Sequence, residues 1–232
     1  NSFGAATYGR LFDGWRAAGH EVAAVEHFGH DAQFPVDRRW QGMTRQLTTL
    51  IDGLAEPKLW LVGHSMGSAI ALTLALDFPK RVLGLGLVGS GARLRVNPQI
   101  LESTASDLLF PHAIKLINEA EFSANVNPRL KELAAQRMNE IRPSVLHGDF
   151  LACNEFDVMS RLGQISKPTL ILCGADDILT PVKYSEFLHS HIANSRLVIV
   201  PEAGHMAMLE APQTVADEIG AFADSIRFRA GQ

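Results

Sequence analysis

Short apolar runs alternate with stretches of helical periodicity along most of the chain. Five runs are nearly continuous in apolar residues and predict β-strands, at residues 22–25, 59–62, 82–88, 169–173 and 197–200. Helical spacing follows each strand or precedes it, over residues 8–18, 43–54, 66–78, 182–190 and 214–226. Strands covered on both faces lose the alternation of apolar and polar residues that half-exposed strands show. The pattern therefore predicts an α/β fold with a doubly wound, mostly parallel sheet.

The strand pattern stops between Ser90 and Lys167, where three helix-like stretches take its place. This segment is too long for a plain loop, and its apolar spacing is too regular for a linker. We therefore predict a helical cap insertion at residues 90–167, with residues 1–89 and 168–232 forming the core domain. The alternative is that the three stretches belong to the main core.

Composition narrows the range of partners. The chain has 232 residues, enough for one domain with a sizeable core. Its formal net charge is -4, and no run of five or more like charges occurs. Nucleic acid and an anionic membrane surface would find no basic stripe to bind. We therefore expect a small-molecule substrate, no nucleic-acid or membrane partner, and an oligomeric state that the sequence leaves open.

Neither a metal site nor a membrane span is indicated. Cys153 and Cys173 lie far from any metal-ligand spacing, so we predict two free thiols, which fit a reducing compartment. No apolar stretch approaches the roughly 18 residues of a membrane span, and the first residues lack the pattern of a signal peptide. We expect a soluble, cytoplasmic protein, although a mature secreted form would look the same.

The candidate nucleophile is Ser65, in the run Gly63-His64-Ser65-Met66-Gly67 between a predicted strand and a helix of small residues. A sharp strand-to-helix turn strains the backbone at the serine, and flanking glycines give the turn room to close. The helix N-terminus adds a partial positive charge and free N–H groups beside the hydroxyl. The alternative is an ordinary glycine-rich turn with a capping serine.

A serine hydroxyl needs a histidine to take its proton and a carboxylate to orient that histidine. Nine histidines compete, and His205 is the one that follows a late strand through a short loop and precedes a helix. In a parallel sheet that loop lies at the same carboxyl edge as the Ser65 turn. His64 neighbours the serine on a tight turn, so its ring should point elsewhere. We expect His64 to pack or to line the pocket.

Two adjacent aspartates, Asp176 and Asp177, follow the strand that ends at Cys173 and compete for the role of the acid. The spacing resolves this ambiguity only in part. We favour Asp177 as the residue that orients His205. Asp176 would instead cap the turn by accepting hydrogen bonds from backbone N–H groups.

Three motifs together carry a family resemblance: Gly-His-Ser-Met-Gly at 63–67, Gly-x-x-Asp-x-x-x-Pro at 174–181, and Gly-His-x-x-x-Leu-Glu-x-Pro at 204–212. With them the chain resembles the alpha/beta-hydrolase superfamily over essentially its whole length, especially the esterase, lactonase and carbon–carbon-bond hydrolase branches. The order serine, aspartate, histidine along the chain is the one that this fold requires. By this resemblance the predicted insertion corresponds to the variable helical cap of such enzymes.

The resemblance also extends to the start of the chain. Residues 1–8 are similar to the loop that supplies an oxyanion donor, which implies that the backbone N–H groups of Phe3 and Met66 stabilise the oxyanion, each by roughly 3 kcal/mol. In the family, the first strands and the central third strand precede this loop, whereas this sequence begins at Asn1. Without a central strand, each orphaned buried group would cost about 1–3 kcal/mol. We therefore expect that the N-terminal strands are missing and that Asn1 is not the natural start. The alternative is that another chain, or a rearranged segment, fills the place of the missing strand.

The implied activity is hydrolysis of a carboxylic ester, thioester or lactone of a small apolar substrate, through an acyl-enzyme and without a cofactor or metal. We expect His64, Ser90, Leu179 and Met206 to contribute to substrate binding. A carbon–carbon-bond hydrolase or a perhydrolase would use the same triad. A small-ligand receptor or signalling protein on the same fold is the alternative of another class.

Overall fold

The structure, a computed structural model, describes residues 58–230 and a few isolated positions before them: Arg16, Val22, Gly42, Thr48, Thr49, Asp52 and Gly53. Most of the elements predicted at 8–18, 22–25 and 43–54 therefore lie outside the described residues, as does Phe3. Within those predictions, the helical positions are Arg16, Thr48, Thr49 and Asp52, whereas Val22 is not in a strand.

Four parallel strands form one sheet in the described part of the chain. They are β1 (Leu59–His64), β2 (Val82–Val88), β3 (Thr169–Gly174) and β4 (Ser195–Val200), which lie in this order across the sheet. Because β1 ends beside the end of β2, and β3 ends beside the end of β4, the loops that follow the strands leave at one edge. The predicted parallel sheet is confirmed, with bounds that differ by a residue or two at the strand ends.

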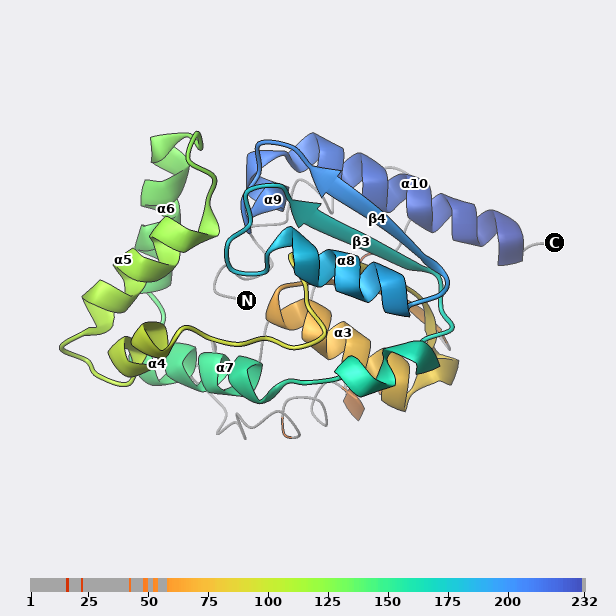
Figure 1. The fold of residues 1–232 in the computed structure, drawn as a ribbon, viewed down its shortest axis with the longest axis horizontal. Coiled ribbons are helices and arrows are strands. Elements are labelled where there is room, and N and C mark those ends of the chain that lie inside the picture. The colour runs from red at the N-terminus through yellow and green to blue at the C-terminus, as the bar shows by residue number, and fades with distance from the viewer. Residues whose placement is uncertain are drawn as a thin grey trace.

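Helices cover both faces of this sheet, as predicted. Helices α3 (Met66–Asp77) and α8 (Val182–His191) pack on one face, and α10 (Pro212–Ala230) packs on the other (Figure 1). Along β3, Ile171 packs with α3 and α8, whereas its two neighbours pack with α10. Burial on both faces explains why this strand is apolar throughout.

Four helices connect β2 to β3: α4 (Pro98–Thr104), α5 (Phe110–Glu121), α6 (Pro128–Asn139) and α7 (Pro143–Glu155). The arrowheads of β3 and β4 point toward α5 and α6, so this helical layer lies beyond the carboxyl ends of the strands (Figure 1). The layer occupies the segment predicted to be a cap insertion, and its status as a separate domain stays a prediction. The shorter elements are η2 (Pro79–Arg81), η3 (Met159–Gln164) and α9 (Ala207–Glu210).

Prolines begin these helices rather than break them, which is why the segment holds four helices instead of the three expected. Pro98 and Pro128 are the first residues of α4 and α6. Asn97 and Asn127 precede them, and each side chain accepts a 2.9 Å hydrogen bond from the N–H two residues further on. A proline at the first helical position costs no hydrogen bond, because that N–H has no partner within the helix.

Both cysteines are free thiols, as predicted, and both are buried. Burial raises the pKa of Cys153 to about 12 and that of Cys173 to about 11, so neither is a thiolate near neutral pH. The described residues contain no cluster of histidine, cysteine and acidic side chains that could hold a metal ion. None of the helices in this part of the chain combines the length and apolar character needed to cross a membrane.

Candidate active site

Ser65 occupies a strained turn between β1 and α3. Its backbone has φ 53° and ψ -118°, a combination that residues other than glycine rarely adopt. The Ser65 N–H donates to the carbonyl of Val88 over 2.9 Å, and the Ser65 carbonyl accepts from the N–H of Ser68 over 2.9 Å. The strain predicted from the sequence is confirmed, and the turn lies at the carboxyl edge of the sheet.

The two glycines that flank this turn differ in their steric role. A Cβ atom added at Gly63 would lie 2.2 Å from the carbonyl oxygen of Gly67, so no side chain fits there. At Gly67, no described atom lies within 4 Å of such a Cβ. The steric reason expected for both glycines therefore holds at Gly63, and the described residues give none for Gly67.

His205 and Asp177 form a buried pair. The Nδ1 atom of His205 lies 2.9 Å from Oδ2 of Asp177, and the two residues are 3% and 4% exposed. The carboxylate also accepts from the N–H of Leu179 at 2.9 Å, the N–H of Thr180 at 2.8 Å and the Thr180 hydroxyl at 2.7 Å. Because Nδ1–H of His205 donates its hydrogen bond to the carboxylate, the other ring nitrogen, Nε2, is free to accept a proton.

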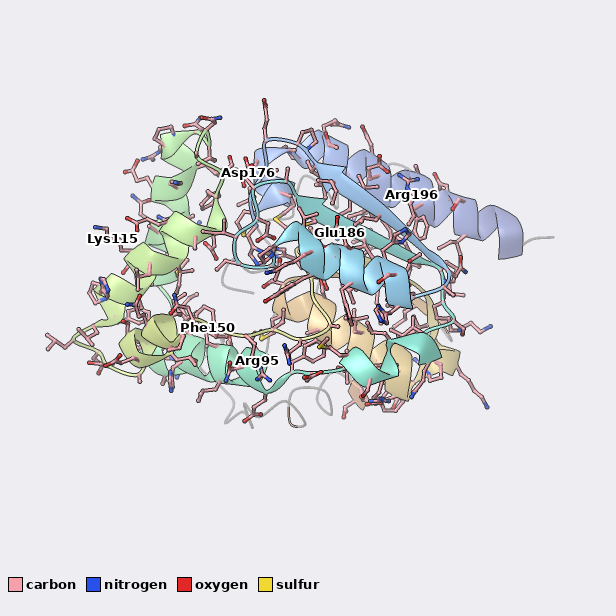
Figure 2. All side chains as sticks on the ribbon, in the orientation of Figure 1. Arg95, Lys115, Phe150, Asp176, Glu186 and Arg196 are labelled. Atoms are coloured by element: carbon pink, nitrogen blue, oxygen red, sulfur yellow. The ribbon has the colours of Figure 1, made fainter. Side chains whose placement is uncertain are left out.

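Asp176 has different surroundings. Its side chain is exposed just after β3, where it is labelled in Figure 2. The turn-capping hydrogen bonds expected of Asp176 are made by Asp177, whose carboxylate faces back over the turn. The structure therefore brings Asp177, and not Asp176, together with His205.

Burial and charge pairing have opposite effects on this pair. Burial raises the pKa of Asp177, but the charge of His205 and the hydrogen bonds to the carboxylate outweigh it, so the pKa is lowered. Burial lowers the pKa of His205, but the charges of Asp177 and Glu121 and the bond to Asp177 raise it above the ordinary 6.5. Each member of the pair therefore stabilises the charged form of the other.

Two residues from neighbouring strand ends fix the position of His205. Gly89 follows β2 with φ 52°, and a Cβ atom there would lie 3.0 Å from Nδ1 of His205. His64 donates a 3.0 Å hydrogen bond from Nε2 to the backbone carbonyl of His205. Burial and the charge of His205 hold the pKa of His64 well below its ordinary value, so its ring is neutral. The ring of His64 thus supports the loop of His205.

A cavity of about 80 Å³ lies between the carboxyl edge of the sheet and the helical layer. Its core side is lined by His64, Ser65, Met66, Leu179, His205 and Met206. The cavity thus brings together three of the four residues predicted to bind substrate. The fourth, Ser90, is fully buried and is not among the described lining residues.

The helical side of the cavity combines apolar and acidic side chains. The apolar ones are Ile100, Ile117, Leu146 and Phe150, the last of which is labelled on α7 in Figure 2. The acidic ones are Glu121 of α5 and Asp149 of α7, which the sequence analysis did not single out. Their signal in the sequence was an acidic residue on the buried stripe of each helix, as in Ile114, Ile117 and Glu121.

Glu210 connects the His205 loop to the helical layer. One carboxylate oxygen accepts from the N–H of Gly204 at 2.8 Å, and the other accepts from the N–H of Ser123 at 2.9 Å. Next to these bonds, the N–H of Met206 donates to the carbonyl of Glu121 at 3.0 Å. Glu210 belongs to a motif that carried the family resemblance, but the sequence assigned it no role.

A doubly wound sheet with a strained serine at its carboxyl edge defines a class of α/β enzymes. The family model described as the alpha/beta hydrolase fold matches residues 7–212, and the chain belongs to that family of hydrolases.

Relatives within the family carry several names. A solved structure called a thermophilic esterase is 34% identical with a TM-score of 0.77, covering 87% of this chain and 79% of that one. The putative carbamate hydrolase RutD of Variovorax paradoxus is 30% identical over 81% of this chain and 75% of its own length. The 2-hydroxy-6-oxo-6-phenylhexa-2,4-dienoate hydrolase of Burkholderia cepacia is 28% identical over 89% of this chain and 78% of its own.

Proposed function

We propose that this protein is a serine hydrolase that cleaves a carboxylic ester, thioester or lactone of a small, largely apolar substrate. Ser65 is the nucleophile, His205 is the general base and Asp177 orients the histidine. The observation that carries the proposal is the buried hydrogen bond between His205 and Asp177, beside a cavity that the strained Ser65 also lines. A nucleophile, a base and an orienting acid at one cavity are the parts that acyl transfer needs.

In the proposed cycle, Nε2 of His205 takes the proton of the Ser65 hydroxyl as the oxygen attacks the substrate carbonyl. The tetrahedral intermediate collapses, and His205 passes the proton to the departing alcohol or thiol. Water then attacks the acyl-enzyme carbonyl while His205 takes its proton. The second intermediate collapses, His205 returns the proton to the departing Ser65 oxygen, and the acid is released. Ser65 and His205 line one cavity without a hydrogen bond between their side chains, so the bond must form when substrate binds.

The oxyanion of the intermediate is assigned to the N–H of Met66. Met66 is the first residue of α3, so its N–H has no acceptor within the helix and points along the positive end of the helix dipole. Such a donor contributes about 3 kcal/mol to transition-state stabilisation. The second donor, Phe3, lies outside the described residues and stays a prediction.

The lining of the cavity favours an ester over a carboxylate-bearing substrate. A dienoate, as in the name of the Burkholderia relative, carries a carboxylate that needs cationic or donor groups. Among the described lining residues there is no lysine or arginine, whereas Glu121 and Asp149 are acidic. A hydrolase of carbon–carbon bonds is therefore the second candidate, and it rests on that relative alone. Carbamates present a similar carbonyl and belong in the same panel of test substrates.

The test is a pre-steady-state assay with p-nitrophenyl esters of short acids, thioesters and lactones. With the p-nitrophenyl esters, we expect the wild-type enzyme to release a burst of p-nitrophenol equal to the enzyme concentration, because acylation by these activated esters is faster than hydrolysis of the acyl-enzyme. Ser65→Ala should abolish the burst. A burst that persists in Ser65→Ala contradicts the proposal. Tight binding of a small ligand with no turnover of any substrate would instead favour a receptor.

A further inference from the structure

Two carboxyl groups are buried in the helical wall of the cavity. Glu121, at the end of α5, and Asp149, on α7, are each 6% exposed. Each lies on the stripe of its helix that is otherwise formed by apolar side chains, such as Ile117 on α5 and Leu146 on α7. An acidic side chain in such a position costs stability unless something compensates for the lost hydration.

At Glu121, hydrogen bonds from the described residues do not compensate for this loss at one carboxylate oxygen. The Oε2 atom of Glu121 has no hydrogen-bond partner among the described residues. Burial raises the pKa of this carboxyl to about 7, although the charge of His205 acts in the opposite direction. A buried acceptor without a described partner, at the wall of a cavity, is a group that a ligand in the cavity can satisfy.

The charges around Glu121 decide which ligand group fits. Among the described lining residues, the other ionisable groups are His205, which is paired with Asp177, the neutral His64, the buried thiol Cys153, and Asp149. The histidine pair carries no net positive charge when His205 is the neutral base of the proposed cycle, and the helical side of the wall adds the two carboxyl groups of Glu121 and Asp149. A substrate carboxylate would meet like charge there, whereas a cation would meet an acceptor and an opposite charge.

We propose that Glu121, together with Asp149, forms an acidic subsite that binds a protonated amine carried by the substrate away from its reacting carbonyl. The inference rests on the proposed function, because the subsite matters only if this cavity holds the substrate of Ser65. It narrows the substrate class to esters that carry an ammonium group and excludes acyl chains that end in a carboxylate.

The first test compares substrates on the wild-type enzyme. Length-matched p-nitrophenyl esters ending in methyl, ammonium or carboxylate (heptanoate, 6-aminohexanoate and the adipate monoester) are assayed beside the shorter pair butanoate and 3-aminopropanoate. Aminoalkyl and plain alkyl esters of one acid extend the comparison to the alcohol side. We expect kcat/KM to favour ammonium over methyl by about 10- to 100-fold, with carboxylate lowest, because hydrogen bonds to charged groups are strong.

Outcomes of this comparison separate the two proposals. Hydrolysis that depends on Ser65 but shows no preference for ammonium on either side overturns the subsite and leaves the hydrolase intact. Failure to cleave any ester, with or without an amine, overturns the proposed function itself.

The second test uses Glu121→Gln, which keeps the shape of the side chain and removes its charge. The ratio of kcat/KM for the ammonium ester to that for the methyl ester should fall by about 10- to 100-fold. Because both esters are measured on one variant, loss of folded protein cancels in the ratio. Glu119→Gln is the matched control on the same helix, since the Glu119 side chain is 61% exposed and its one ion pair among the described residues is with Lys115 at 3.9 Å.

An unchanged ratio in folded Glu121→Gln, or an equal fall in Glu119→Gln, contradicts the subsite. If Glu121→Gln does not fold, Asp149→Asn takes its place and should lower the same ratio, and the wild-type comparison still decides between the outcomes.

Discussion

Asp176 and Asp177 are neighbours in sequence, yet one side chain faces solvent and the other faces a histidine. The distinction arises from the turn after β3, in which the carboxylate of Asp177 folds back onto the N–H groups of Leu179 and Thr180. The sequence analysis placed the candidate acid after this strand and favoured Asp177 over Asp176, without excluding either residue. Which of two adjacent side chains points inward depends on the backbone angles of the turn, and a pattern of residue types does not fix these angles.

Replacing Asp177 with Asn should lower kcat by roughly 10^4-fold, because an amide in this position favours the wrong tautomer of His205. Asp176→Asn is the matched control and should retain wild-type activity, since its side chain is exposed. Steady-state kinetics on the ester that gives the burst, with circular dichroism to verify folding, measure both. The opposite result, with Asp176→Asn inactive and Asp177→Asn active, would reverse the assignment.

Glu121 links pH to stability. Its pKa is raised from 4.5 to about 7 in the folded protein, so the folded state holds this proton more tightly than the unfolded state does. The stability that this provides is fully present below about pH 4.5 and is lost as pH rises through about 7. Glu121→Gln does not titrate, so it should gain up to about 3 kcal/mol relative to wild type between these limits.

Thermal or urea unfolding of wild type and Glu121→Gln at pH 5 and pH 8 measures this difference. The variant should be relatively more stable at pH 8 than at pH 5, and Glu119→Gln should show no such change. A difference in stability that is the same at both pH values would show that Glu121 does not carry a raised pKa.

At the scale of elements, strands were easier to predict than helices. Strands β2 and β3 are buried on both faces, so their apolar runs are continuous and stand out in any window. The sequence analysis expected three helices between β2 and β3, whereas the structure has four, of which three begin at Pro98, Pro128 and Pro143. The acidic residues of the cavity wall were not predicted either. Glu121 stands out as a candidate only once the buried face of α5 is known.

The carboxylate of Glu210 connects the loop of His205 to the segment that follows α5. Glu210→Ala leaves the N–H groups of Gly204 and Ser123 without their acceptor, so we expect a loss of about 1–3 kcal/mol of stability. Because the same loop carries His205, kcat/KM should also fall. Urea unfolding and ester kinetics measure the two effects.

Glu186→Ala, at an exposed position of α8 labelled in Figure 2, is the control for the Glu210 variant and should change neither quantity. A Glu210→Ala variant that keeps wild-type stability and activity would show that the helical layer does not depend on this carboxylate.

On the scale of the whole molecule, the cavity exists because two layers meet at one edge. The sheet delivers Ser65, Asp177 and His205 to its carboxyl edge, and the helices between β2 and β3 cover that edge (Figure 1). The sequence predicted this arrangement because parallel strands constrain where their loops emerge. The sequence did not predict which side chains line the helical side of the cavity. Their positions depend on how α5 and α7 pack against the sheet edge, and this packing is set by contacts between residues far apart in the chain.

The backbone of Ser65 has a further consequence for the stability of the whole fold. A serine held at φ 53° and ψ -118° costs about 1–3 kcal/mol, whereas glycine adopts such angles freely. Ser65→Gly should therefore melt at a higher temperature than wild type and hydrolyse no ester, and a melting temperature equal to or below that of wild type would show that the turn is not strained. A laboratory selection for heat resistance alone would therefore favour inactive variants such as Ser65→Gly. Selection for stability must be combined with a screen for activity.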